Sequence, residues 1–152
     1  MGLNIADLKI TSPDFDNGAR LDDRHANDRD NVPPGLTISG VPDGTQELAI
    51  ICHDPDAPMP FGFTHWTLYG LPADTTDVTK DADEQFTPGP NDFGATGWGG
   101  PQPPDGHGPH HYYFWVYALD TRVSGTPSRK EFLETYGDNS VEPTRVVGVY
   151  ER

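Results

Sequence analysis

Two carboxylates stand in a proline-rich segment that follows an apolar run. Asp54 and Asp56 alternate with Pro55, and Pro58 follows after Ala57. Proline fixes its own backbone angle and has no amide hydrogen, so the prolines hold the carboxylates in a defined direction. Carboxylates held in this way can orient a histidine, bind a cation or act in proton transfer. The alternative is an ordinary turn that leaves a strand.

A histidine and a tryptophan, His65 and Trp66, follow in the next strand-like segment. Side chains alternate along a strand, so one of the two can face a pocket while the other packs in the core. A single strand histidine is more often structural than a ligand contact. The prediction that His65 contacts a ligand therefore depends on the other polar clusters.

A Gly- and Pro-rich segment, residues 99–109, leads into the most strand-like part of the sequence. His110 and Tyr112 are two residues apart and share one face of that strand, so they can act together. His107 and His111 are interpreted as surface residues. The alternative is that the whole segment is only a rigid connection.

Imidazole, phenol and carboxylate groups in one pocket suit three kinds of site. Charged histidines and a tyrosine hydroxyl bind phosphate or a similar anion through charge-assisted hydrogen bonds. Two His and two Asp can bind a divalent metal, but their spacing fits no zinc motif, so no metal is expected. A hydrolase with Asp54 and His65 as acid and base is the third kind. No serine or cysteine has a recognisable nucleophile motif, so no enzymatic turnover is expected.

These polar residues lie where predicted strands meet loops. Alternating or continuous apolar residues predict strands at residues 6–10, 36–39, 47–53, 64–69, 111–119 and 145–150. The continuous apolar run at 47–53 is expected to be a buried central strand that ends in a polar loop. The strand at 111–119 is rich in aromatic residues and is also expected to be central. Residues 17–34 are expected to form a surface loop, and residues 74–110 to be mostly irregular.

One short helix is predicted near the C-terminus. Ser128 and Glu131 have the spacing of a capping box, apolar residues between 132 and 136 share one face, and Gly137 supplies a stop. With 17 Gly and 16 Pro, the chain is too interrupted for a helical bundle. The sequence predicts a single, mainly β domain over residues 1–152, with long loops.

The chain is strongly acidic, with 24 Asp and Glu against 10 Lys and Arg and a formal charge of −14 at pH 7. Such a charge repels nucleic acid and anionic membranes, and no apolar run is long enough to span a bilayer, so neither partner is expected. The balance resembles that of proteins from salt-loving cells.

Cys52 lies in an apolar run and is expected to be a buried thiol. Because the sequence has no recognisable secretory signal, a reducing, cytoplasmic location is expected.

The order of these motifs resembles the phosphatidylethanolamine-binding protein (PEBP) family, specifically its short bacterial and archaeal, Raf kinase inhibitor-like branch. The resemblance covers nearly the whole chain and rests on Asn31–Leu36, Gly40–Pro42, Asp54–Pro58, His65–Trp66, Gly99–His110 and Tyr112–Leu119. It implies a fold of packed antiparallel β-sheets with one or two short helices and an anion pocket at one end of the strands.

The resemblance also implies roles for four residues of the first two clusters. Asp54 corresponds to the family's pocket aspartate and Asp56 to its supporting carboxylate. Pro58 corresponds to a pocket-shaping proline that is often preceded by a cis bond. His65 corresponds to the strand histidine of the pocket.

Four further residues of the Gly/Pro-rich segment and the following strand carry over in the same way. Gly100 and Pro101 correspond to the wall of the pocket, His110 to its second histidine, and Tyr112 to the tyrosine whose hydroxyl reaches the ligand. Position 111 is His where relatives commonly carry Arg, so basic contacts at the rim are not expected.

The sequence therefore predicts a binding protein for a small anion, such as phosphate or a phosphoethanolamine-like headgroup. No cofactor is expected, and the role of the protein is expected to be regulatory. In the expected mechanism His65 and His110 supply positive charge, backbone amides near Gly100 donate hydrogen bonds, and Asp54 holds a histidine in its charged form. The alternative is an inhibitor module that binds a phosphopeptide or protein partner. Relatives suggest a homodimer.

Overall fold

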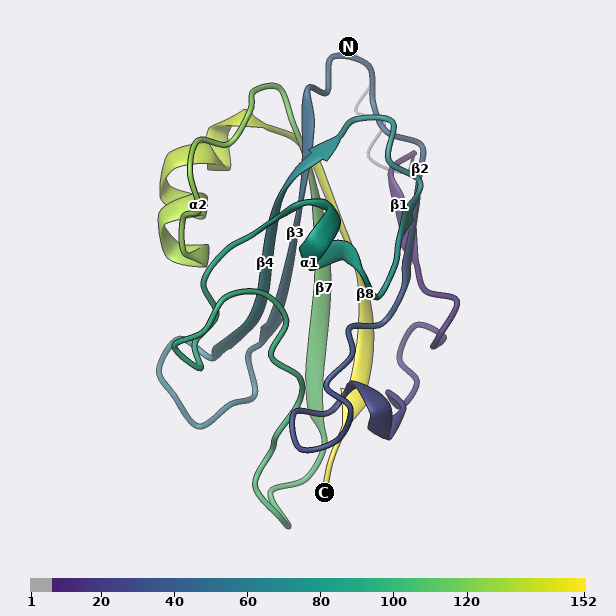
Figure 1. The fold of residues 1–152 in the computed structure, drawn as a ribbon, viewed down its shortest axis with the longest axis vertical. Helices are drawn as coiled ribbons and strands as arrows, with labels where there is room; N and C mark the ends of the chain where they lie inside the picture. Colours follow the sequence, from purple (N-terminus) through teal and green to yellow (C-terminus); the bar gives the residue numbers. More distant parts are fainter. Residues whose placement is uncertain (1–6) are drawn as a thin grey trace.

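The computed structural model describes residues 7–152 and contains two antiparallel β-sheets that pack against each other (Figure 1). The smaller sheet has the order β1-β2-β5 and consists of β1 (Lys9–Thr11), β2 (Leu36–Ser39) and β5 (Asp77–Val78). The larger has the order β6-β4-β3-β7-β8 and consists of β6 (Thr87–Pro88), β4 (Phe63–Pro72), β3 (Glu47–Asp54), β7 (His110–Leu119) and β8 (Ser140–Tyr150). The predicted mainly β fold is confirmed.

The main helix is α2 (Arg129–Tyr136), and the shorter helical segments are α1 (Ala82–Gln85), η1 (Asp23–His25) and η2 (Gly137–Asn139). The predicted capping box is present, because the Ser128 hydroxyl accepts from the Glu131 amide and the Glu131 carboxylate accepts from the Ser128 amide. Gly137 ends α2 with an ordinary right-handed φ of −54°, and the chain continues into η2. Within residues 7–152 no helix is long and apolar enough to cross a membrane.

Strand β3 is buried along its whole length because both faces of the larger sheet are covered. On one face, Ile50 and Cys52 belong to the core shared with Leu36 and Ile38 of the smaller sheet. On the other face, Ile51 packs in a second cluster with residues of α2. Figure 1 shows α2 and the smaller sheet on opposite sides of the larger sheet. A strand buried on both faces needs the continuous apolar run that the sequence contains.

The antiparallel pairing of β3 brings distant segments to one end of the larger sheet. Cys52 is paired with Trp66 of β4 on one side and with Phe114 of β7 on the other. The end of β3, the first residues of β4 and the first residues of β7 are therefore neighbours. These are the places where the sequence puts its polar clusters.

The structure corrects several predicted boundaries. The first strand is β1, which begins at Lys9; residue 6 lies outside the described residues. The strands predicted at 64–69 and 145–150 are longer, as β4 and β8 show. Strand β7 is interior but second from the edge, and β3 is the middle strand. The extra length comes from pairing with neighbours, which continues beyond the most apolar residues.

The two predicted loops are also more structured than their polar composition indicates. In residues 17–34, Leu21, His25 and Ala26 are buried. Residues 74–110 contain β5, α1 and β6 and are attached to the core through Asp83, whose carboxylate accepts hydrogen bonds from the Trp66 indole (2.8 Å) and the Trp98 amide (2.9 Å). The expectation of a purely surface loop at 17–34 is wrong.

Candidate functional site

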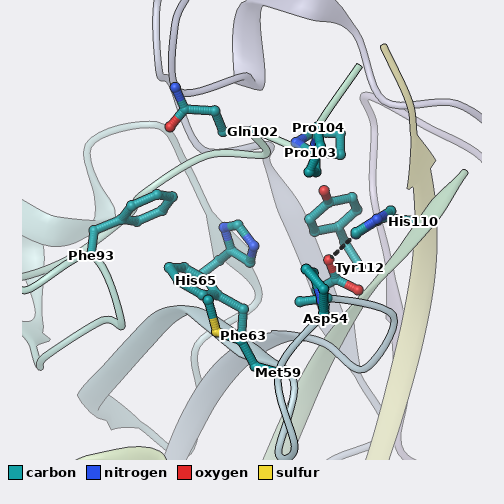
Figure 2. Close-up of a pocket in the computed structure, with 12 residues that line it drawn as sticks. Asp54, Met59, Phe63, His65, Phe93, Gln102, Pro103, Pro104, His110 and Tyr112 are labelled. Atoms are coloured by element: carbon teal, nitrogen blue, oxygen red, sulfur yellow. Dashed lines mark hydrogen bonds and ion pairs between the residues drawn. The ribbon is translucent and has the colours of Figure 1, made fainter. Parts of the chain in front are cut away.

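A cavity of about 170 Å³ lies at this end of the larger sheet. Figure 2 shows a polar side formed by Asp54, His110 and Tyr112 and, facing it, a side on which His65 lies with Phe63 and Phe93. The full set of lining residues is Asp54, Ala57, Pro58, Met59, Phe63, His65, Phe93, Gln102, Pro103, Pro104, His110 and Tyr112. The four side chains on which the sequence prediction depends thus surround one space.

Three neighbouring strands deliver these side chains. Asp54 is the last residue of β3, His65 is the third residue of β4, and His110 and Tyr112 are the first and third residues of β7. The alternation in β7 turns His110 and Tyr112 inward, where both are buried, while His111 stays exposed. In β4 the same alternation turns Trp66 into the core, as predicted.

Asp54, His110 and His107 form a chain of hydrogen bonds. The Asp54 carboxylate accepts from Nδ1 of His110 at 2.6 Å, and its other oxygen accepts from the Asp56 amide at 2.7 Å. His110 therefore carries a proton on Nδ1, and in its neutral form Nε2 accepts from Nδ1 of His107, 2.6 Å away. Sequence reasoning interpreted His107 as a surface residue without a role; it is exposed, but it is the direct partner of His110.

Burial shifts the pKa of two lining groups. Desolvation raises the pKa of Asp54, and the hydrogen bond from His110 only partly opposes this effect. Desolvation lowers the pKa of His65 to about 4, so His65 is neutral at pH 7. Its Nδ1 donates to the Gly99 carbonyl at 2.6 Å, which leaves Nε2 without a proton. The expectation that His65 supplies positive charge is wrong, because this buried histidine is an acceptor.

Tyr112 offers a hydrogen-bond donor to the cavity. Its ring is buried, and desolvation followed by the nearby Asp54 carboxylate raises its pKa, so the hydroxyl keeps its proton. In Figure 2 the hydroxyl is directed toward Pro103 and Pro104, neither of which can donate or accept through its side chain. Within residues 7–152 no protein group is hydrogen-bonded to it. A ligand oxygen in the cavity can therefore accept from Tyr112.

Asp56 lies outside the set of lining residues and supports the site indirectly. Its amide donates to Asp54, and its carboxylate accepts from both the amide (2.8 Å) and Nδ1 (2.7 Å) of His111. Although slight burial opposes the shift, these bonds from His111 lower the pKa of Asp56. Asp56 thus ties the loop after β3 to the start of β7.

The wall residues Gly100 and Pro101 do not line the cavity. The Gly100 amide donates to the Asn31 side chain at 2.8 Å. The expectation that this amide donates to an anion is therefore wrong. A side chain at position 100 would collide with the carbonyl oxygen of His25, which explains the need for glycine. Pro58 lines the cavity, but its peptide bond is trans, and the cis bond implied by the resemblance is absent from the described residues.

Sequence reasoning missed the apolar part of the cavity. Phe63 packs against Phe93 and His65, with ring centres 4.6 and 4.8 Å apart, and Met59 lies on the same side in Figure 2. Phe93 comes from the irregular segment before the wall, so its place is set by tertiary packing alone. The Pro103–Pro104 pair was a usable signal, because two rigid apolar rings beside a polar cluster are suited to lining a pocket.

No metal site competes for these residues in the part of the chain that the structure describes. Within residues 7–152 there is no group of three or more His, Cys, Asp or Glu side chains arranged to hold an ion. The carboxylates of Asp54 and Asp56 each pair with a different histidine, and the two pairs lie on opposite faces of β7. The donors are therefore divided between two places.

The sequence is similar to those of known proteins. A sequence model described as phosphatidylethanolamine-binding protein matches residues 11–151. The UPF0098 protein YbcL of Escherichia coli is 40% identical over an alignment of 162 positions, which covers 96% of this chain and 88% of YbcL. A UPF0098 protein of Archaeoglobus fulgidus is 37% identical over 145 residues, 91% of this chain, and this chain spans about half (49%) of that relative's length.

The structures agree as well. The crystal structure of E. coli YbcL, described as a new member of the mammalian PEBP family, matches with a TM-score of 0.88 and 34% identity over 96% of this chain and 99% of that one. The site described above therefore sits on a fold shared with E. coli YbcL.

Proposed function

Because this chain belongs to the phosphatidylethanolamine-binding protein family, we propose that its cavity binds small molecules that carry a phosphoryl group, such as a phosphoethanolamine-like headgroup. The observation that carries the proposal is the Tyr112 hydroxyl, a buried donor with its proton retained and no protein partner in residues 7–152, beside the hydrogen-bonded pair of His110 and His107. Phosphoryl oxygens are acceptors that such donors satisfy.

The size of the cavity limits the ligand. An apolar cavity of roughly 150 Å³ holds a benzene molecule, so about 170 Å³ accommodates a phosphoryl group with a few further atoms. A complete diacyl lipid is far larger. Only a headgroup, or a free small molecule, fits inside.

The charge of the cavity requires proton uptake on binding. The lining residues include no Lys or Arg, His65 is neutral, and Asp54 is the only acidic lining residue. An anion near Asp54 is favourable only when the hydrogen-bonded group of Asp54, His110 and His107 carries an additional proton.

The ligand has two chemically different ends to satisfy. Its phosphoryl oxygens accept from the Tyr112 hydroxyl and lie beside the His110–His107 pair, whereas the remainder packs on Phe63, Phe93 and Met59. A positively charged amine on the ligand also gains from the Asp54 carboxylate and from the faces of the aromatic rings. A zwitterionic headgroup is therefore a better match than inorganic phosphate.

Calorimetric titration with phosphoethanolamine tests the proposal. The Tyr112→Phe variant removes one hydroxyl and is expected to bind about 10-fold more weakly, as for loss of one hydrogen bond to a charged group. Tyr113→Phe is the matched control, because Tyr113 lies on the opposite face of β7. Wild-type titrations in two buffers of different ionisation enthalpy should show proton uptake. Equal affinities of the Tyr112→Phe and wild-type proteins would contradict the proposed role of the hydroxyl.

A second candidate function, the binding of a second copy of this chain, is favoured by the apolar rim of the cavity. Met59 and Phe93 line the mouth and are 50% and 40% exposed, and Phe61, two residues from Met59, is 88% exposed. Exposed aromatic side chains at this density mark contact surfaces. Sedimentation analysis should show self-association that Phe61→Ser weakens and Val141→Ser, a change of an exposed residue in β8, leaves unchanged. A wild-type monomer at every concentration tested would exclude the homodimer.

A further inference from the structure

The hydrogen-bonded chain at the cavity has the arrangement of a nucleophile, a base and an orienting carboxylate. Asp54 binds Nδ1 of His110 at 2.6 Å, and Nε2 of His110 binds Nδ1 of His107 at 2.6 Å. In catalytic triads a nucleophile lies within hydrogen-bond reach of a base, and a third group orients that base. We propose that His107 is a nucleophile that accepts acyl groups from small neutral esters through Nε2, with His110 as its base and Asp54 as the positioning residue. This activity goes beyond ligand binding.

The burial of the three groups supports this assignment. Asp54 and His110 are 2% exposed, so their hydrogen bond is shielded from water, whereas His107 is exposed and presents its free nitrogen to a reactant. The two Asp54 oxygens are both occupied, one by the Asp56 amide, which fixes the carboxylate relative to the His110 ring. A fixed carboxylate keeps the proton of His110 on Nδ1 and leaves Nε2 free to act as a base.

The reaction balances without a cofactor. The lone pair on Nε2 of His107 attacks the ester carbonyl carbon, a C–N bond forms, and the ester C–O bond breaks as the alcohol oxygen leaves with the electron pair. The proton on Nδ1 of His107 passes to Nε2 of His110, which faces it. At the other ring nitrogen, a water molecule protonates the leaving oxygen, and the resulting hydroxide cleaves the acylimidazole to the carboxylic acid. The proton on His110 then returns to Nδ1 of His107. The sequence predicts no turnover because no serine or cysteine has a nucleophile motif. This route uses a histidine as the nucleophile, so that argument does not exclude it.

The surroundings favour a neutral ester with a small apolar or aromatic group. The His107 amide donates to the Pro104 carbonyl at 3.2 Å, and Pro104 lines the cavity, so the nucleophile lies at its edge. The aromatic side formed by Phe63 and Phe93 accepts an apolar group. No Lys or Arg lines the cavity to pair with an anionic acyl donor, so a neutral ester is the better substrate.

Para-nitrophenyl acetate is a suitable probe, with release of nitrophenolate as the readout. Exchange of His107 for Gln is expected to lower the second-order rate constant about 100-fold, the effect of removing a positioned general base or its nucleophile. His111→Gln is the matched control, because His111 is also exposed and carries a carboxylate partner, Asp56, but has no second imidazole. This variant should retain the wild-type rate.

Two further readouts separate a chemical role from a structural one. After an acid quench, mass spectrometry of peptides should place the acetyl group on His107. In the Asp54→Asn variant, nitrogen NMR of the His110 ring should show loss of the protonated Nδ1 state together with a rate at least about 10-fold lower. Equal rates for the wild-type and His107→Gln proteins, or an acetyl group found only on other residues, would overturn the proposal. Headgroup binding, measured separately by calorimetry, would stand in either case.

Discussion

The neutral state of His65 makes the stability of this protein depend on pH in a defined window. The folded protein holds the pKa of this buried histidine at about 4, against an ordinary value of 6.5. Between these values the unfolded chain binds a proton that the folded protein does not. The contribution of His65 to the free energy of unfolding is therefore fully present above pH 6.5 and is lost as the pH falls toward 4.

The size of the effect follows from the two pKa values. Where the unfolded chain binds one proton more than the folded protein, the free energy of unfolding falls by about 1.4 kcal/mol for each unit that the pH falls. From about pH 7.5 to about pH 5 the unfolded chain gains nearly one proton at His65, and the summed loss is about 2 kcal/mol. This range stays above the isoelectric point of about 4.5, where an acidic protein tends to precipitate.

The His65→Phe variant isolates this contribution. Phenylalanine fills the space between Phe63 and Tyr112, whose ring centres lie 4.8 and 5.1 Å from that of His65, and has no proton to gain. It loses the hydrogen bond to the Gly99 carbonyl, which lowers stability by about 1 kcal/mol at every pH. Burial also lowers the pKa of His53 to about 4, but that histidine is present in both proteins and cancels in their difference.

Urea unfolding followed by tryptophan fluorescence at several pH values measures the difference. The wild-type free energy of unfolding should fall by about 2 kcal/mol more than that of His65→Phe between about pH 7.5 and pH 5. If the free energies of unfolding of the two proteins change in parallel with pH, burial does not hold His65 neutral. In that case His65 can supply a positive charge to the cavity, contrary to the description given above.

Three further substitutions test the packing around the site. Asp83→Ala leaves the buried Trp66 indole without a hydrogen-bond acceptor and should lower the free energy of unfolding by about 2 kcal/mol in urea titrations; an unchanged midpoint would show that this bond is dispensable. Phe132→Ala, which empties the cluster beneath α2, should cost about 3–5 kcal/mol by the same assay, and a loss below about 1 kcal/mol would mean that α2 closes over the gap. Ser128→Ala removes the cap of α2 and should cost about 1 kcal/mol, seen as a small decrease in thermal midpoint by circular dichroism; a midpoint equal to that of the wild type would argue against the cap.

Local rules in the sequence account for the elements of the fold. The apolar run at 47–53 predicts a strand buried on both faces, and the structure has β3 in that role. The alternation after residue 110 predicts that His110 and Tyr112 face one way and His111 the other, as observed. The capping residues predict where α2 begins. Each of these features depends on neighbours within a few residues, so a single sequence carries the information.

The chemistry of the site depends on contacts that no local pattern contains. The neutral His65 results from burial and from a carbonyl 34 residues away, and the Gly100 amide is taken by Asn31, 69 residues away. The partnership of His107 with His110 requires a turn whose direction is set by packing. The sequence by itself determined which polar side chains reach one end of the sheet, because strand alternation is local. Only the tertiary structure decided which of their nitrogens and oxygens are already occupied, because desolvation and hydrogen bonding depend on the positions of atoms brought together by the whole fold.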